Sequence, residues 1–130
     1  MWNRGREQLC LRHLDHIKHA LGISGVATES SAWRHVAKRG EDIRGAQIDL
    51  VIKRADRMIH LVEMKFASAR YSISKDYATQ LRERRMTFME DEKIAQAPVI
   101  TFITPYGISN GANSGIVHSE ITSEQLFAHI

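Results

Sequence analysis

Two short runs of aliphatic and β-branched residues, separated by only four residues, most constrain how this chain can fold. Residues 46–53 read AQIDLVIK and residues 58–66 read MIHLVEMKF. Runs of this composition are typical of β-strands, and their short separation predicts an antiparallel β-hairpin. Because side chains on a strand alternate between the two faces of a sheet, the register of this hairpin decides which of them meet.

The predicted hairpin brings two carboxylates together. If the turn is centred on Asp56, position i lies opposite position 112 − i, so Asp49 lies opposite Glu63, on a face with Gln47 and Val51. Directly opposite residues have Cβ atoms about 4.5–5.5 Å apart. The pairing requires an odd-numbered loop, such as residues 55–57, because a shift of one residue would turn Asp49 to the other face. Lys65 shares the face of Glu63.

Two carboxylates this close need a compensating cation. Like charges on opposite residues destabilise a sheet, and burial adds a desolvation cost. Mg²⁺ is suitable because it prefers oxygen ligands and retains several waters. It would activate a bound water and polarise a phosphoryl oxygen, while Lys65 would orient the water or stabilise charge on a scissile phosphate. The alternative is a solvent-facing pair of carboxylates, matched by nearby lysine or arginine side chains.

The remaining pattern predicts an α/β fold with a mixed central β-sheet flanked by helices. The length of 130 residues suits one domain, residues 1–130. Ser74 is expected to cap the longest helix, and Gly22 to end the first. The other expected elements are a helix at 4–21, an extended segment at 26–36, a helix at 74–92, a strand at 98–104, a strand at 116–121 and a short helix with a capping box at 122–125.

The first predicted helix carries one further acid. Cys10, Leu14, Ile17 and Leu21 form an apolar stripe at helical spacing, and one step back along it lies Glu7. We expect Glu7 to reach the carboxylate pair as an outer ligand or as a residue that holds a water. Cys10 is the single cysteine, which fits a reducing, cytoplasmic setting, and no apolar run approaches the ~20 residues of a membrane span.

Basic residues concentrate just after the hairpin. Residues 70–85 hold five basic and two acidic side chains, whereas residues 86–130 hold one basic and five acidic ones. A basic stripe attracts phosphate backbones, so this segment is a candidate nucleic-acid interface; a solvated helix face is the alternative. The basic side chains are Arg70, Lys75, Arg82, Arg84 and Arg85.

The acidic pattern resembles the PD-(D/E)XK nuclease superfamily. The resemblance is carried by Ile48-Asp49, then thirteen residues, then the triplet Glu63-Met64-Lys65. An N-terminal helix with a glutamate is similar to the Holliday-junction resolvase branch. The phrases GAQIDLVIKRAD, LVEMKF, KDYATQLR and ITFITPYGI further resemble a nuclease-like domain at the C-terminus of bacterial AAA-type ATPases. This chain itself contains no phosphate-binding GxxxxGK[ST] loop.

The resemblance implies a restriction-endonuclease-like core of order αβββαβ and metal-dependent phosphodiester hydrolysis on DNA, with Mg²⁺ or Mn²⁺ as cofactor. Asp49, Glu63 and the Met64 carbonyl would hold the metal, and Lys65 would be the catalytic lysine. Glu7 and Gln80 would complete the site. A catalytically silent nucleic-acid- or protein-binding module is the alternative. An AAA-type ATPase domain or protein is the implied partner, and a homodimer is a further one, because resolvase-like relatives work as dimers.

Overall fold

The computed structural model describes residue 5, residues 12–35 and residues 46–128. Glu7 and Cys10 therefore lie outside the described residues. The elements in chain order are α2 (Leu14–Ala20), β1 (Thr28–His35), β2 (Ala46–Arg54), β3 (Ile59–Met64), α3 (Lys75–Asp91), β4 (Val99–Ile103), a 3-10 helix η1 (Ser114–Ile116), β5 (Val117–Ile121) and α4 (Ser123–Phe127). This order confirms the predicted α/β fold class.

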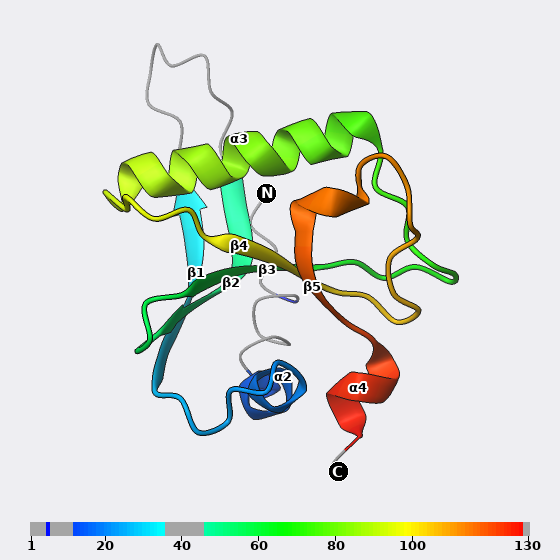
Figure 1. The fold of residues 1–130 in the computed structure, drawn as a ribbon, viewed down its shortest axis with the longest axis horizontal. Coiled ribbons are helices and arrows are strands. Elements are labelled where there is room, and N and C mark those ends of the chain that lie inside the picture. The colour runs from blue at the N-terminus through cyan, green and yellow to red at the C-terminus, as the bar shows by residue number, and fades with distance from the viewer. Residues whose placement is uncertain (1–4, 6–11, 36–45, 129–130) are drawn as a thin grey trace.

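The five strands form one open, mixed sheet in the order β1-β2-β3-β4-β5. The first three strands run antiparallel as a meander, while β4 lies parallel to β3 and β5 lies parallel to β4. Parallel neighbours need a crossover, and α3 supplies it between β3 and β4 (Figure 1). The sheet therefore carries the predicted hairpin on one side and a β-α-β unit on the other, with β3 shared by both.

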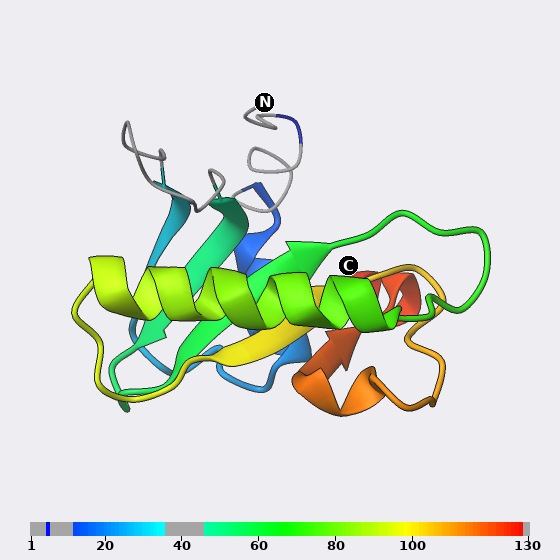
Figure 2. The ribbon, with the colours of Figure 1, turned by 90° about the horizontal axis from the view of Figure 1, so that it is seen from above.

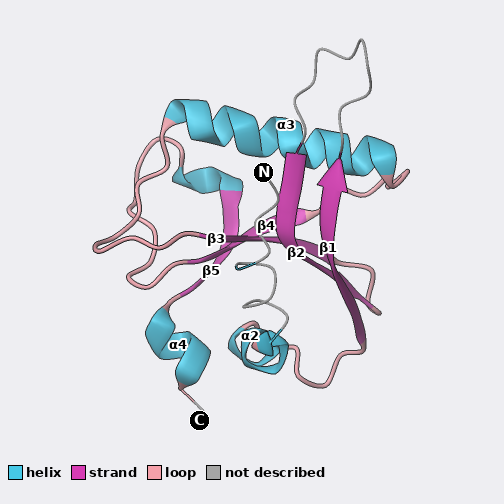
Figure 3. Ribbon diagram, turned by 180° about the vertical axis from the view of Figure 1, so that it is seen from behind, coloured by secondary structure: helices cyan, strands magenta, loops and turns pink. Residues whose placement is uncertain are grey.

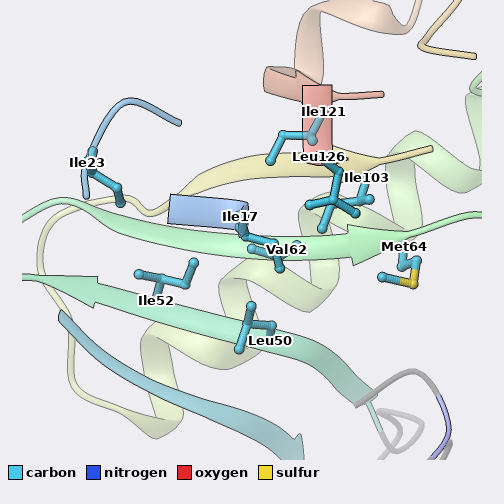
Figure 4. Close-up of a cluster of buried hydrophobic side chains, with 9 residues drawn as sticks. All are labelled: Ile17, Ile23, Leu50, Ile52, Val62, Met64, Ile103, Ile121 and Leu126. Carbon is cyan, nitrogen blue, oxygen red and sulfur yellow. The ribbon is translucent and has the colours of Figure 1, made fainter. Parts of the chain in front are cut away.

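Helices cover both faces of the sheet. α3 lies along one face, whereas α2 and α4 lie side by side against the other (Figures 1 and 3). Seen from above, α3 crosses the strands (Figure 2). The core on the α2 and α4 side is shown in Figure 4 and consists of Ile17, Ile23, Leu50, Ile52, Val62, Met64, Ile103, Ile121 and Leu126. Within the described residues, no helix is long and apolar enough to span a membrane.

The hairpin has the predicted register. Leu50 pairs with Val62 and Lys53 pairs with Ile59, which is the expected relation of i to 112 − i. The Arg54 N–H donates to the Met58 carbonyl at 2.9 Å, closing a three-residue loop over residues 55–57. Arg57 has a left-handed φ of 73°, as three-residue hairpin loops commonly require at this position.

Strand β2 contains an irregularity that the sequence analysis did not predict. Ser31 lies opposite Val51 and Trp33 lies opposite Ile48, so two β2 residues face the single β1 residue between Ser31 and Trp33. Those two residues are Asp49 and Leu50. The predicted strict alternation, with Gln47, Asp49 and Val51 on one face, is therefore wrong: Ile48 and Val51 both join the cluster around Phe88 of α3. Bulges of this kind re-aim a side chain locally.

The helix ends follow the sequence signals. Gly22, with a φ of 75°, ends α2, and the Ile23 N–H donates to the Lys18 carbonyl at 2.9 Å. Thr122 and Gln125 form the predicted capping box of α4. Ser74 caps α3, because its hydroxyl accepts a hydrogen bond from the Tyr77 N–H at 3.1 Å.

We expect Ser74→Ala to lower the free energy of unfolding by about 1 kcal/mol, because it leaves one N–H at the start of α3 without its acceptor. Urea denaturation of the wild type and the variant would measure this loss. Ser72→Ala, at an exposed position just before the helix, is the matched control and should change stability by less than about 0.5 kcal/mol. Equal losses in both variants would contradict the capping role.

Candidate active site at the open end of the hairpin

The predicted carboxylates lie where the hairpin ladder ends. The last paired residues of β2 and β3 at this end are Leu50 and Val62, and Asp49 and Glu63 follow directly beyond them. Asp49 is 7% exposed and Glu63 is 6% exposed. Ionised carboxylates are costly to bury without compensating partners, so the partners of these two define the site.

Asp49 reaches across from β2 to β3. One of its carboxylate oxygens accepts a hydrogen bond from the Met64 backbone N–H at 3.4 Å. This contact bridges the two strands beyond the end of their ladder and brings the Asp49 carboxylate to the peptide that joins Glu63 to Met64. Asp49 thus lies beside the β3 backbone at Glu63 and Met64. The predicted ladder pair of Asp49 with Glu63 is absent from the described register, which ends at Leu50 and Val62, where the bulge in β2 begins.

The charge of Glu63 is neutralised by a side chain of helix α3. Its carboxylate forms an ion pair with the Arg84 guanidinium of α3. The Glu63 side chain is 7% exposed and the Arg84 side chain is 24% exposed, so the carboxylate is the more deeply buried partner. Hydrogen bonds between guanidinium and carboxylate groups are among the stronger ones in proteins. Arg84 therefore supplies part of the positive charge that the sequence analysis assigned to a metal.

Lys65 lies next to the same helix. Its ammonium nitrogen is 4.5 Å from the centre of the Tyr77 ring, a cation–π contact. Because Leu61 packs near Phe88, Glu63 pairs with Arg84 and Lys65 covers Tyr77, three alternate residues of β3 all face α3. The predicted common face of Leu61, Glu63 and Lys65 is confirmed.

The Tyr77 side chain lies beneath the Lys65 ammonium group and interacts electrostatically with Glu63. Burial raises the pKa of its phenol well above the ordinary value, and the negative charge of Glu63 raises it further. The phenol therefore stays protonated at neutral pH. Its ring packs edge-on against Tyr71 and Phe102, with centroids 6.2 Å apart in both pairs. Tyr77 is thus fixed by an aromatic cluster and can act as a rigid support for Lys65.

The other predicted site residues lie around this centre. Gln80 is exposed, one helical turn from both Tyr77 and Arg84. Arg70, Lys75 and Arg82 are exposed, and Arg85 is half-buried. Because successive helix positions turn by about 100°, Arg82 lies on a different side of α3 from Arg84, which faces the sheet and contacts Glu63. The basic segment is therefore divided between the site and the surface.

The donor chemistry of the site is compatible with a hard divalent cation. Two buried carboxylates on neighbouring strands are oxygen ligands of the kind that Mg²⁺ takes, and Mg²⁺ commonly uses only one or two of them together with waters. In the described part of the chain there is no group of three or more His, Cys, Asp and Glu side chains that could hold a metal ion. Asp49 and Glu63 stay the candidate protein ligands predicted from the sequence, and Glu63 also pairs with Arg84.

The sequence analysis missed the roles of Arg84 and Tyr77 at this centre, although a signal was present. Leu81 and Phe88 belong to the apolar side of α3, and Arg84 lies three residues after the first and four before the second. A charged residue at this spacing faces the sheet and needs a partner there. Glu63, on the α3 face of β3, is that partner.

Comparison with known proteins shows the fold alone. No protein-family model and no curated protein matches the sequence. The chain is similar in structure to a solved protein described as "Protein of Unknown Function AF1548", with a TM-score of 0.51 and 16% sequence identity. The similarity covers 83% of this chain and 55% of that protein, so the chain spans about half the length of its structural neighbour.

Proposed function

We propose that this domain is a metal-dependent nuclease of the PD-(D/E)XK type that hydrolyses phosphodiester bonds in DNA with water as the nucleophile. The observation that carries the proposal is the position of Asp49, Glu63 and Lys65 at the open end of one hairpin: Asp49 accepts a hydrogen bond from the Met64 N–H, and Glu63 and Lys65 face α3. Two acids and a lysine at this spacing match the motif of that superfamily. The low identity of the structural neighbour leaves the chemistry of the side chains as the basis of the proposal.

Each residue has a distinct part in the proposed reaction. Asp49 and Glu63 would hold Mg²⁺ or Mn²⁺, with the Met64 carbonyl as a further ligand. The bound ion would lower the pKa of a water and polarise the phosphoryl oxygen. Lys65, held above the Tyr77 ring, would donate hydrogen bonds to the water or to the oxygen on which negative charge develops. Glu7 and Gln80 would support the same centre.

A cleavage assay with purified protein tests this proposal. Branched, duplex and single-stranded DNA would be incubated with Mg²⁺ or Mn²⁺. Asp49→Asn and Lys65→Met should each lower the rate by at least about 100-fold, because each removes a group that acts on the reacting phosphate. Lys53→Met is the matched control: Lys53 lies on β2 near the closed end of the hairpin, where it pairs with Glu92 at 3.6 Å. Cleavage that survives both site variants would refute the proposal.

A second candidate is a catalytically silent module that binds nucleic acid or protein without metal. One observation favours it: Arg84 already neutralises Glu63. The exposed Arg70, Lys75 and Arg82 would then bind phosphates. Salt-dependent DNA binding that Glu63→Gln leaves unchanged, without metal affinity, would favour this candidate over the nuclease.

The setting proposed for either function follows the sequence analysis. A DNA substrate and a single cysteine fit a cytoplasmic location. The resemblance to ATPase-linked domains makes an AAA-type ATPase the proposed protein partner, and a second copy of this chain is the other. Size-exclusion chromatography with light scattering, with and without DNA, would distinguish a monomer from a dimer.

A further inference from the structure

The ion pair between Arg84 and Glu63 conflicts with metal binding at the same carboxylate. A guanidinium in contact with Glu63 lies within a few ångströms of any divalent cation that Glu63 holds. Two positive groups at that separation repel each other strongly in a site where both carboxylates are less than a tenth exposed. Either the metal binds weakly or Arg84 gives way.

We propose that Arg84 is an exchangeable counter-ion: it neutralises Glu63 in the metal-free protein, and moves to a phosphate of the nucleic acid when a divalent cation takes its place. This inference rests on the proposed nuclease function and adds a positioning residue that recognises the substrate. Arg84 suits the second role because guanidinium groups bind phosphate oxygens with two parallel hydrogen bonds.

The surroundings of the two cations explain why Arg84 moves and Lys65 stays. Arg84 comes from α3, and a quarter of its side chain is exposed, so its long side chain has solvent beside it. Lys65 is only two residues from Glu63 on β3, and its ammonium lies 4.5 Å from the centre of the Tyr77 ring. That ring is fixed by Tyr71 and Phe102. Lys65 is thus the permanent cation of the site and Arg84 the mobile one.

This exchange couples two ligands. The divalent cation releases Arg84, and the released guanidinium then binds the phosphate, so each ligand should strengthen the binding of the other. Linkage requires the coupling to be the same in both directions. A coupling of about 5- to 150-fold is typical of two ligands that act on one shared element. Without Arg84, the divalent cation would bind more tightly in the absence of DNA, and the coupling between cation and phosphate binding would fall.

Binding measurements test the proposal without relying on catalysis. Mn²⁺ affinity would be measured by electron paramagnetic resonance for the wild type, Arg84→Gln and Arg84→Lys, each with and without a short duplex of DNA. DNA affinity would be measured with Ca²⁺ and without metal. Arg84→Gln should bind Mn²⁺ about tenfold more tightly than the wild type, and the coupling between metal and DNA should fall at least fivefold. Arg57→Gln, in the exposed loop at the closed end of the hairpin, is the matched control.

The outcomes separate this inference from the proposed function. Equal Mn²⁺ affinity in the wild type and Arg84→Gln would overturn the exchange and leave the nuclease proposal standing. An absence of Mn²⁺ binding in every variant would overturn both. Should Arg84→Gln not fold by circular dichroism, Arg84→Lys decides: it keeps the charge and loses the two-pronged phosphate contact, so an unchanged coupling in this variant would overturn the exchange and a reduced coupling would support it.

Discussion

Replacing Arg84 with alanine is expected to lower the free energy of unfolding by about 3 kcal/mol. The substitution leaves the Glu63 carboxylate, whose side chain is 7% exposed, buried without its counter-charge. Removal of one partner of a buried ion pair commonly costs about 3–5 kcal/mol, and the lower end applies because a quarter of the Arg84 side chain is exposed. Urea denaturation at pH 7 would measure the loss.

A double-mutant cycle isolates the pair from other effects of the substitution. Glu63→Gln removes the charge that Arg84 compensates, so in that background Arg84→Ala should cost about 1 kcal/mol or less. The matched control is the pair of Lys53 and Glu92, whose side chains are 41% and 36% exposed and whose charged atoms are 3.6 Å apart. Its coupling should stay below about 1 kcal/mol. If Arg84→Ala costs the same with and without Glu63, the ion pair does not stabilise the domain.

Local signals in the sequence were sufficient to predict the hairpin and the helix ends. The register followed from the short connection, because a three-residue loop fixes which side chains lie opposite one another. Ser74 and Thr122 could be predicted as caps because the hydrogen bonds they make are to residues only three positions away. Glu63 and Lys65 could be placed on one face because they are two residues apart on the same strand.

Contacts between distant segments could not be predicted in this way. The bulge at Asp49 and Leu50 depends on how β1 pairs with β2, and no short-range pattern determines that pairing. Arg84 is 21 residues from Glu63, and their contact depends on how α3 docks on the sheet. The sequence analysis therefore found the carboxylates and missed the guanidinium that neutralises one of them. The position of Glu7 lies outside the described residues and stays a prediction.

A buried histidine on β3 also depends on tertiary contacts. His60 is 1% exposed, and its Nδ1 lies 3.0 Å from the Thr101 hydroxyl. Its Nε2 lies 3.2 Å from one guanidinium nitrogen of Arg54. The other terminal nitrogen of the same guanidinium pairs with Asp56 at 2.5 Å. Because arginine only donates, Nε2 must accept, so we assign the proton to Nδ1, which donates to Thr101. Protonation of Nε2 would break the contact with Arg54.

This arrangement predicts a loss of stability in mild acid. Burial lowers the pKa of His60 from 6.5 to about 4, and the positive charge of Arg54 adds to the effect. In the unfolded chain the histidine takes up its proton near pH 6.5, whereas in the folded protein it stays neutral until about pH 4. The stability due to neutral His60 is therefore fully present above pH 6.5 and is lost as the pH falls towards 4. The loss amounts to about 3 kcal/mol.

Urea denaturation at intervals from pH 7.5 to pH 4 would measure this loss as the difference between the wild type and His60→Gln. The glutamine side chain can still accept a hydrogen bond from Arg54 through its amide oxygen, and it does not itself titrate in this range. The stability of the variant should fall by about 3 kcal/mol less than that of the wild type between pH 7 and pH 4, whatever its stability at pH 7. His118→Gln, which removes an exposed histidine on β5, is the control and should keep most of the wild-type slope. Parallel curves for the wild type and His60→Gln would show that His60 has the same pKa in the folded and the unfolded protein, and would contradict the assigned contact with Arg54.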